Sequence, residues 1–337
     1  MEPLIIRVDA AGETTVDTPD PILDELVTLQ EAGTCEEAIP RFEKFLEDFP
    51  ESLRFGEAVV RLGVCHEERK EWEIARGYHR WAAENAHFEL AYEAALRGAW
   101  CLEEMGQYAR AAEEYAALAG VARAPDEARA GARLRSAVNL FRAGKSKKAH
   151  AALDAGIVAY SSVPDPSPPV QSAAAEARFA SAEETAHAFS VIELPYPQRR
   201  LDKRVKQKLE ALVSARTAFQ QVTAIKDAEW AAAAVCREGE MFEEFHDALV
   251  KVPPPKNLRS PELRAEYETQ VAAKAKPFLQ QAFDHHVQVV SLGERVGLDS
   301  PWVTRSREHM RAIELELKSA VVSPDEEDLD APREEPE

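Results

Sequence analysis

The chain has 337 residues, with 60 acidic and 41 basic side chains and a formal net charge of −19. That acidity argues against a duplex DNA binder, because neutralising phosphates requires a concentrated basic face. With 45% hydrophobic and 30% charged residues, the composition is typical of a soluble globular protein, and the length suggests about two domains. No run of about 18 apolar residues occurs, so we expect no membrane-spanning helix.

The N-terminal segment, residues 1–19, is expected to form an arm ahead of the first helix. Leu4 to Val8 is β-like and could be a short arm or an added edge strand. Met1 to Arg7 has a three-residue apolar stretch with no basic region before it, so no export leader is visible. We therefore expect a cytoplasmic protein, with a periplasmic or envelope location as the alternative if a leader has been removed.

Apolar residues recur at intervals of three and four, which predicts amphipathic helices and an all-α fold. Within this pattern four frames repeat, each placing a turn residue five positions before an alanine that allows two helices to approach closely. The frames are Gly33 with Ala38, Lys70 with Ala75, Gly106 with Ala111, and Gly144 with Ala149. Bulky residues follow each alanine after four positions, namely Phe42, His79, Tyr115 and Leu153. Twelve positions before each alanine stand Leu26, Gly63, Ala99 and Ala137.

The frames resemble the tetratricopeptide repeat (TPR), through Leu62-Gly63, the run Gly106 to Ala111 with Tyr115, and Ala38 with Phe42 and Pro50. Residues 20–160 would then form four repeats. His79 stands where the family usually has an aromatic residue, and Leu26 where it usually has a small one. The resemblance implies a solenoid of helical hairpins whose first helices line a concave groove.

The four cysteines, Cys35, Cys65, Cys101 and Cys236, lack the C-x-x-C spacing of zinc and redox motifs. Cys65 and Cys101 hold equivalent places in successive repeats. Adjacent helices pack about 8–10 Å apart, whereas bridged cysteines need Cα atoms within about 7 Å. We therefore interpret the cysteines as reduced, mostly buried small apolar residues.

After the repeats, four prolines predict a linker over residues 161–171, followed by a C-terminal helical domain over 172–319. Long helices are expected at 172–193, 199–226, 228–251, 261–293 and 301–319. In the second of these, one apolar face is formed by Leu201, Val205, Leu209, Leu212, Phe219 and Val222. Residues 320–337 are expected to be a disordered acidic tail.

Several short strings of this half resemble the helical domain that follows the repeats in cell-envelope TPR proteins of gliding and predatory bacteria. They are 194–201, 229–234, 252–254, and 294–297 with Ser300-Pro301-Trp302. The resemblance implies an export leader and a role in envelope complexes, some of them linked to gliding motility. This sequence departs from that pattern in showing no leader.

No motif of catalysis, phosphate binding or calcium binding is found, so we predict no enzyme, no catalytic residue and no cofactor. Metal candidates are His66-Glu67-Glu68 and His285-His286. Neighbours on a helix point about 100 degrees apart, so the adjacent histidines cannot share one ion as an i,i+4 pair can. We favour surface or partly buried histidines and predict no metal site.

The predicted groove presents an apolar stripe beside an acidic one. By the register of the resemblance, the partner-binding residues are Val60, Val64, Glu67, Glu68, Leu96, Trp100, Glu103, Glu104, Val138, Phe141 and Arg142. Leu23, Val27, Gln30, Glu31 and Leu134 extend the same stripes. Such a surface suits a protein segment with apolar anchors and Lys or Arg flanks. The alternative is that the apolar residues pack between repeats or against the second domain and the glutamates are a solvated face.

A basic strip, Arg199 to Lys208, has six bases opposed by Asp202. It could bind nucleic acid or anionic lipid, but it lacks interleaved aromatic residues, so a solvated helix is favoured and nucleic acid is not predicted as a partner. A third possibility is docking on acidic segments of the same chain.

The sequence therefore predicts a non-enzymatic TPR scaffold that binds a protein or peptide segment in the concave groove. The alternative is a structural subunit of a bacterial cell-envelope or gliding-motility complex, which would associate peripherally with a membrane assembly through its outer surface.

Overall fold

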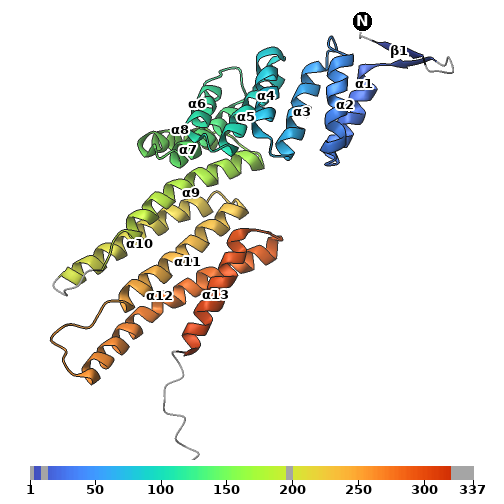
Figure 1. Ribbon diagram of the computed structural model, residues 1–337. Coiled ribbons are helices and arrows are strands. Elements are labelled where there is room, and N and C mark those ends of the chain that lie inside the picture. The colour runs from blue at the N-terminus through green and yellow to red at the C-terminus, as the bar shows by residue number, and fades with distance from the viewer. Residues whose placement is uncertain (1–3, 9–13, 195–199, 320–337) are drawn as a thin grey trace, which may run out of the picture. The chain divides into compact units, whose positions relative to one another are not determined.

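The computed structural model describes residues 4–8, 14–194 and 200–319, and these residues are almost entirely helical (Figure 1). The predicted all-α fold is confirmed. The chain divides into two compact units, Met1–Ala177 and Arg178–Glu337. Among the described helices, none is both long enough and apolar enough to cross a membrane.

The N-terminal arm is a β-hairpin. Strand β1 (Ile5–Val8) pairs antiparallel with β2 (Thr14–Asp17), so that Ile5 lies opposite Asp17. The β-like stretch thus pairs with its own neighbour in the chain. Ile5 packs on the core of the first helices, which ties the hairpin to the repeats.

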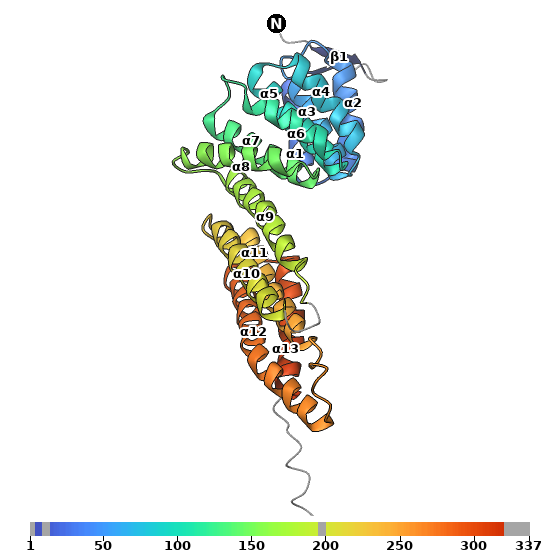
Figure 2. The same cartoon turned by 90° about the vertical axis from the view of Figure 1, so that its left-hand side faces the viewer.

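Eight helices of the first unit form four hairpins that follow one another along the chain (Figure 2). They are α1 (Pro19–Glu31) with α2 (Cys35–Asp48), α3 (Phe55–Glu68) with α4 (Trp72–Asn85), α5 (Phe88–Glu104) with α6 (Tyr108–Ala119), and α7 (Asp126–Arg142) with α8 (Ser146–Ser161). This is the predicted TPR-like solenoid of helical hairpins.

Each hairpin turns at the residue that the sequence frame places there. Gly33, Lys70, Gly106 and Gly144 all have left-handed backbones, with φ between 60° and 75°. The residue after each turn donates its N–H to a carbonyl five positions back, as Thr34 does to Leu29 and Glu71 to His66. This 6→1 bond is the Schellman cap, which satisfies the free carbonyls at the end of a helix.

The small and bulky positions of the frames are all buried, as close helix packing requires. The four alanines are completely buried: Ala38, Ala75, Ala111 and Ala149. The bulky residues are at most 3% exposed: Phe42, His79, Tyr115 and Leu153. The unusual His79 fits because its helix faces Gly63. A Cβ at Gly63 would lie 2.6 Å from the His79 ring, so the glycine makes room for the imidazole.

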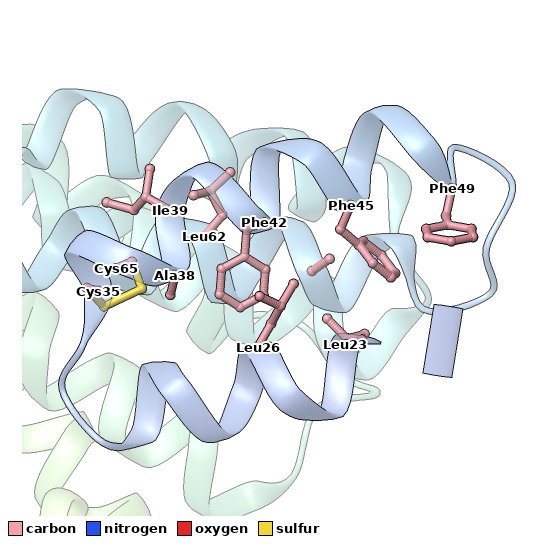
Figure 3. Packing of buried hydrophobic residues seen from close by; sticks show 11 residues of the cluster. Leu23, Leu26, Cys35, Ala38, Ile39, Phe42, Phe45, Phe49, Leu62 and Cys65 are labelled. Atoms are coloured by element: carbon pink, nitrogen blue, oxygen red, sulfur yellow. A yellow bond between two sulfur atoms is a disulfide. The ribbon is translucent and has the colours of Figure 1, made fainter. Parts of the chain in front are cut away.

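The interpretation of all four cysteines as reduced thiols is wrong for two of them. Cys35 and Cys65 form a disulfide with a Cα–Cα distance of 5.1 Å, next to Ala38 and in the same buried cluster as Phe42 and Leu62 (Figure 3). The general helix spacing did not exclude this pair, because Cys35 begins α2 where that helix meets α3. A bridge that closes a loop with a sequence separation of 30 stabilises the fold by about 3 to 4 kcal/mol.

The second unit is built from longer helices. Helix α9 (Pro168–Ser190) contains the boundary between the units and is followed by α10 (Leu201–Thr223), α11 (Ala228–Val250), α12 (Pro261–Val296) and α13 (Pro301–Ser319). Helices α11, α12 and α13 share a core of Ala232, Cys236, Val289 and Val303.

Two features of this half differ in detail from the expectation. Pro168 and Pro169, in the range predicted as linker, occupy the first turn of α9, where proline is tolerated because the first N–H groups have no helical partner. On α10 the core side of the expected apolar face is Leu212, Phe219 and Val222, while Leu209 is exposed. The predicted acidic tail and Arg199 lie outside the described residues.

Lys70 is the one turn residue of the four hairpins that is not glycine, so Lys70→Gly should stabilise the fold by roughly 0.5 to 1 kcal/mol, because a side chain disfavours positive φ. Urea unfolding followed by circular dichroism measures the change. Gly106→Lys is the matched control and should destabilise the fold, because a side chain disfavours the positive φ of this position. A Cβ there would meet no neighbour within 4 Å, so this backbone preference is the whole cost. A neutral or destabilising Lys70→Gly would contradict the assignment of this turn.

Thiol counting tests the disulfide. Burial raises the pKa of Cys101 to about 12 and that of Cys236 to about 11, so iodoacetamide at pH 8 should alkylate neither in the native protein. Denaturant without reductant should expose two thiols, and denaturant with reductant should expose four. Mass spectrometry that finds label on Cys35 or Cys65 before reduction would overturn the bridge.

Candidate functional site

The predicted partner-binding residues all lie on the first helices of the hairpins, but the structure buries several of them. Val60, Glu67, Glu103 and Val138 are at most 5% exposed. Val64, Leu96, Trp100 and Phe141 are half-buried, and Glu68, Glu104 and Arg142 are exposed. The accessible part of the predicted set is therefore smaller than the sequence pattern indicates.

One cavity of about 380 Å³ lies on the first helices of three successive hairpins. Gln30 comes from α1, Val60 and Val64 from α3, and Leu90 from α5. Its other lining residues are the histidine His87 and the charged residues Glu57, Arg61, Glu93 and Arg97. We call this cavity, which apolar and charged side chains line together, the α3–α5 groove.

A repeated polar contact joins each first helix to the next. Arg61 Nη1 donates to Gln30 Oε1 at 2.9 Å, Arg97 Nη1 to Glu67 Oε2 at 2.8 Å, and Arg135 Nη2 to Glu103 Oε1 at 2.7 Å. Every acceptor stands three residues before its own hairpin turn, and every arginine nine residues before the next turn. We call this series the arginine ladder.

The ladder is most heavily charged at its last step. Glu103 also accepts from Arg142 Nη1 at 2.7 Å and from Asn139 Nδ2 at 2.9 Å. Both arginines also reach Glu176 in the first half of α9, at 2.7 and 2.5 Å. Burial lowers the pKa of Arg135, but attraction to Glu103 and Glu176 outweighs it and the net shift is upward. Arg135 thus remains protonated.

At the middle step, Glu67 has partners on both sides. Its Oε1 lies 2.8 Å from His79 Nε2 and 4.0 Å from Cys101 Sγ, while its Oε2 accepts from Arg97. Glu67, His79 and Cys101 are residue types that bind metal ions, and their ligand atoms lie within 4.8 Å of one another. All three are buried, and the Arg97 guanidinium already neutralises the carboxylate, so this cluster is better suited to holding α3, α4 and α5 together.

The ladder changes the electrostatics expected of the groove. Glu67 and Glu103 are buried and neutralised by arginines, so they hold neighbouring hairpins together instead of facing a partner. The exposed acidic side chains of these helices are Glu68 and Glu104 from the predicted set, neither of which lines the α3–α5 groove, and Glu93, which does. Arg61, Arg97 and Arg135 are not among the predicted site residues, although their constant distance from the hairpin turns is a signal that the sequence contains.

The predicted basic strip is partly internal to the second unit. Lys208 is 2% exposed, and its Nζ donates to Glu244 Oε1 at 2.7 Å and to the carbonyl of Phe189 at 3.2 Å. Lys206 lies near Glu210 at 3.9 Å, and Lys203 is exposed. Lys208 is therefore buried and paired inside the second unit, so the basic strip carries less positive charge at the surface than its sequence suggests.

The sequence matches no protein-family model and no curated protein. Among solved structures, a TPR repeats protein (BF2334) from Bacteroides fragilis NCTC 9343 is 13% identical with a TM-score of 0.34, and the match covers 88% of this chain and 98% of that one. The assembly chaperone of RpL4 (Acl4, residues 1–338) is 16% identical with a TM-score of 0.27, over 90% of this chain and 98% of that one. At these scores the TPR-like description depends on the hairpins, turns and buried alanines themselves.

Replacing Arg97 tests the arginine ladder. Arg97→Met should destabilise the protein by roughly 2 kcal/mol, because it leaves the Glu67 carboxylate buried without the guanidinium that pairs with it. This is less than the loss of a fully buried pair would cost, because the Arg97 side chain is about one third exposed to solvent. Chemical denaturation of the full chain measures the change. Arg80→Met, at an exposed position of α4, is the control and should stay within about 0.5 kcal/mol. Equal effects of the two changes would contradict the ladder.

Proposed function

We propose that the chain is a non-enzymatic scaffold that binds a segment of another protein in the α3–α5 groove. The observation that carries the proposal is the cavity of about 380 Å³ that Val60, Val64 and Leu90 line together with charged side chains from successive hairpins. Such a shape accepts an apolar anchor residue, and the surrounding charges orient the chain that carries it.

The charge at the groove favours a partner with basic flanks. Glu31 and Glu93 are exposed but pair with Arg61 and Arg97, at 3.4 and 3.3 Å, and the same two arginines also donate to Gln30 and Glu67. Glu68 and Glu104, exposed on α3 and α5, have no lysine or arginine partner within the described residues and supply the uncompensated negative charge of these helices. A segment with one large apolar residue and nearby Lys or Arg side chains would complement this surface and would be steered to it.

A second candidate, a structural subunit of an envelope complex, is favoured by the Cys35–Cys65 disulfide. Disulfides persist in oxidising compartments, including the bacterial periplasm, and are rare in the cytosol. In this role the outer surface would make permanent contacts and the groove would not be required. The link to gliding motility stays a hypothesis based on the short strings of the C-terminal half.

The groove test compares affinity purification of wild type with a triple variant, Val64→Asp, Glu68→Lys and Glu104→Lys. These positions are half-buried or exposed, so the variant should fold, whereas Glu103→Lys would place a third cation beside Arg135 and Arg142. We expect the variant to lose a specific partner at least about tenfold, as expected when an anchor pocket is blocked.

The matched control carries Ile74→Asp, Glu73→Lys and Glu113→Lys, exposed positions of the second helices α4 and α6. It should retain the partner. If both triple variants keep the same proteins at fixed stoichiometry, the groove is not the binding site and the structural-subunit alternative is favoured. Circular dichroism melts of all three proteins separate loss of binding from loss of folding.

A further inference from the structure

Three helices of the second unit bring two imidazoles and a carboxylate to one point. Glu243 is on α11, His286 on α12 and His309 on α13. Glu243 Oε1 lies 2.8 Å from His286 Nε2 and 2.8 Å from His309 Nδ1. The two rings stack with centroids 5.0 Å apart. The ligand atoms of all three residues lie within 4.8 Å of one another.

The outer nitrogen of each imidazole faces a group that can orient it. His286 Nδ1 lies 3.3 Å from Ser306 Oγ, and His309 Nε2 lies 3.8 Å from Glu240 Oε1. In metal sites the non-ligating nitrogen usually donates its proton to such an oxygen, which fixes the tautomer and leaves the other nitrogen with a free lone pair. Without a metal, the nitrogens that lie 2.8 Å from the Glu243 carboxylate donate their N–H to it; a bound ion would take the place of those protons, and the outer nitrogens would then carry the proton.

The surrounding charges leave Glu243 available as a ligand. The neighbouring Glu240 is held by Arg237 and by Arg305 Nε at 2.5 Å. Within the described residues, Glu243 has no lysine or arginine partner and contacts the two imidazoles instead. This distinguishes it from Glu67 in the first unit, whose carboxylate is paired with Arg97.

The cluster also has a buried side and an open side. His286 is completely buried, and a Cβ on Gly239 would lie 2.8 Å from its ring, so glycine is needed for the ring to fit. The side chains of Glu243 and His309 are 24% and 31% exposed, which gives access to solvent. An ion could enter from the open side and retain a water molecule there.

We propose that Glu243 Oε1, His286 Nε2 and His309 Nδ1 form a binding site for a divalent transition-metal ion, with Zn²⁺ as the first candidate. Two histidines and one carboxylate with an open fourth position are a known ligand set for zinc. Tetrahedral bonds of about 2.0–2.1 Å place ligand atoms about 3.3 Å apart, so the 2.8 Å separations need to open by about half an ångström. Rotation of the partly exposed His309 and Glu243 can supply that movement.

The test is calorimetric titration of the EDTA-treated, dialysed full chain with ZnCl₂, followed by Co²⁺ absorption spectroscopy. We expect one site, with cobalt bands typical of tetrahedral nitrogen and oxygen ligation. Glu243→Gln and His309→Gln should each weaken binding by at least about tenfold, since both remove a direct ligand and even the loss of a residue that only orients a ligand costs about 10–100-fold.

His285→Gln is the matched control, because His285 is adjacent in sequence but faces Glu238, with Nε2 3.4 Å from Oε2. It should bind zinc as wild type does. Cys101→Ala tests whether cobalt binds instead at Glu67, His79 and Cys101 in the first unit. Cobalt bound there would give a cobalt–thiolate absorption band that this variant lacks. Absence of a stoichiometric zinc site, or binding unaffected by both glutamine substitutions, would show that Glu243 serves as a hydrogen-bond acceptor for two histidines and would overturn the proposal. Metal-free circular dichroism melts verify that the variants fold.

Discussion

The first unit depends on arginines that reach from one helical hairpin to a buried acceptor on the hairpin before it. Removing a carboxylate from water is costly unless a cation and further hydrogen bonds replace the lost hydration. Arg97 and Arg135 meet that requirement for Glu67 and Glu103. At the first step Arg61 donates to Gln30, whose side chain is uncharged. Because each pair forms in one alignment of adjacent first helices, the ladder opposes a slip of one hairpin along the next.

The buried ladder also determines what remains for a partner. A carboxylate that is paired inside the fold contributes little field at the surface, so the exposed acidic charge of these helices comes from the next residue along each of them. In two repeats this residue is Glu68 or Glu104, which immediately follows the buried Glu67 or Glu103. One helix thus uses adjacent acidic residues for different purposes, the first for cohesion between hairpins and the second for the exposed surface.

The sequence was sufficient for the hairpins because their determinants are local. The left-handed turn residues and the alanines recur at nearly fixed spacing, and the structure has all of them in the expected roles. It was insufficient for the site because the burial of a glutamate depends on a partner about 30 residues away. The predicted register assigned both Glu67 and Glu68 to the groove, and the contact from Arg97 identifies Glu67 as the buried one.

The same limit applies more strongly to contacts between helices that have no repeat register. Cys35 and Cys65 occupy different positions of their hairpins, so comparing equivalent positions pointed to Cys65 with Cys101 and missed the true pair. In the second unit, His286 is 43 residues from Glu243, and His309 is 66 residues from it. Adjacent His285 and His286 attracted attention in the sequence, but helix geometry sends them to different carboxylates, Glu238 and Glu243. Three long helices packed side by side are what bring the separated residues together, and a short motif cannot encode that arrangement.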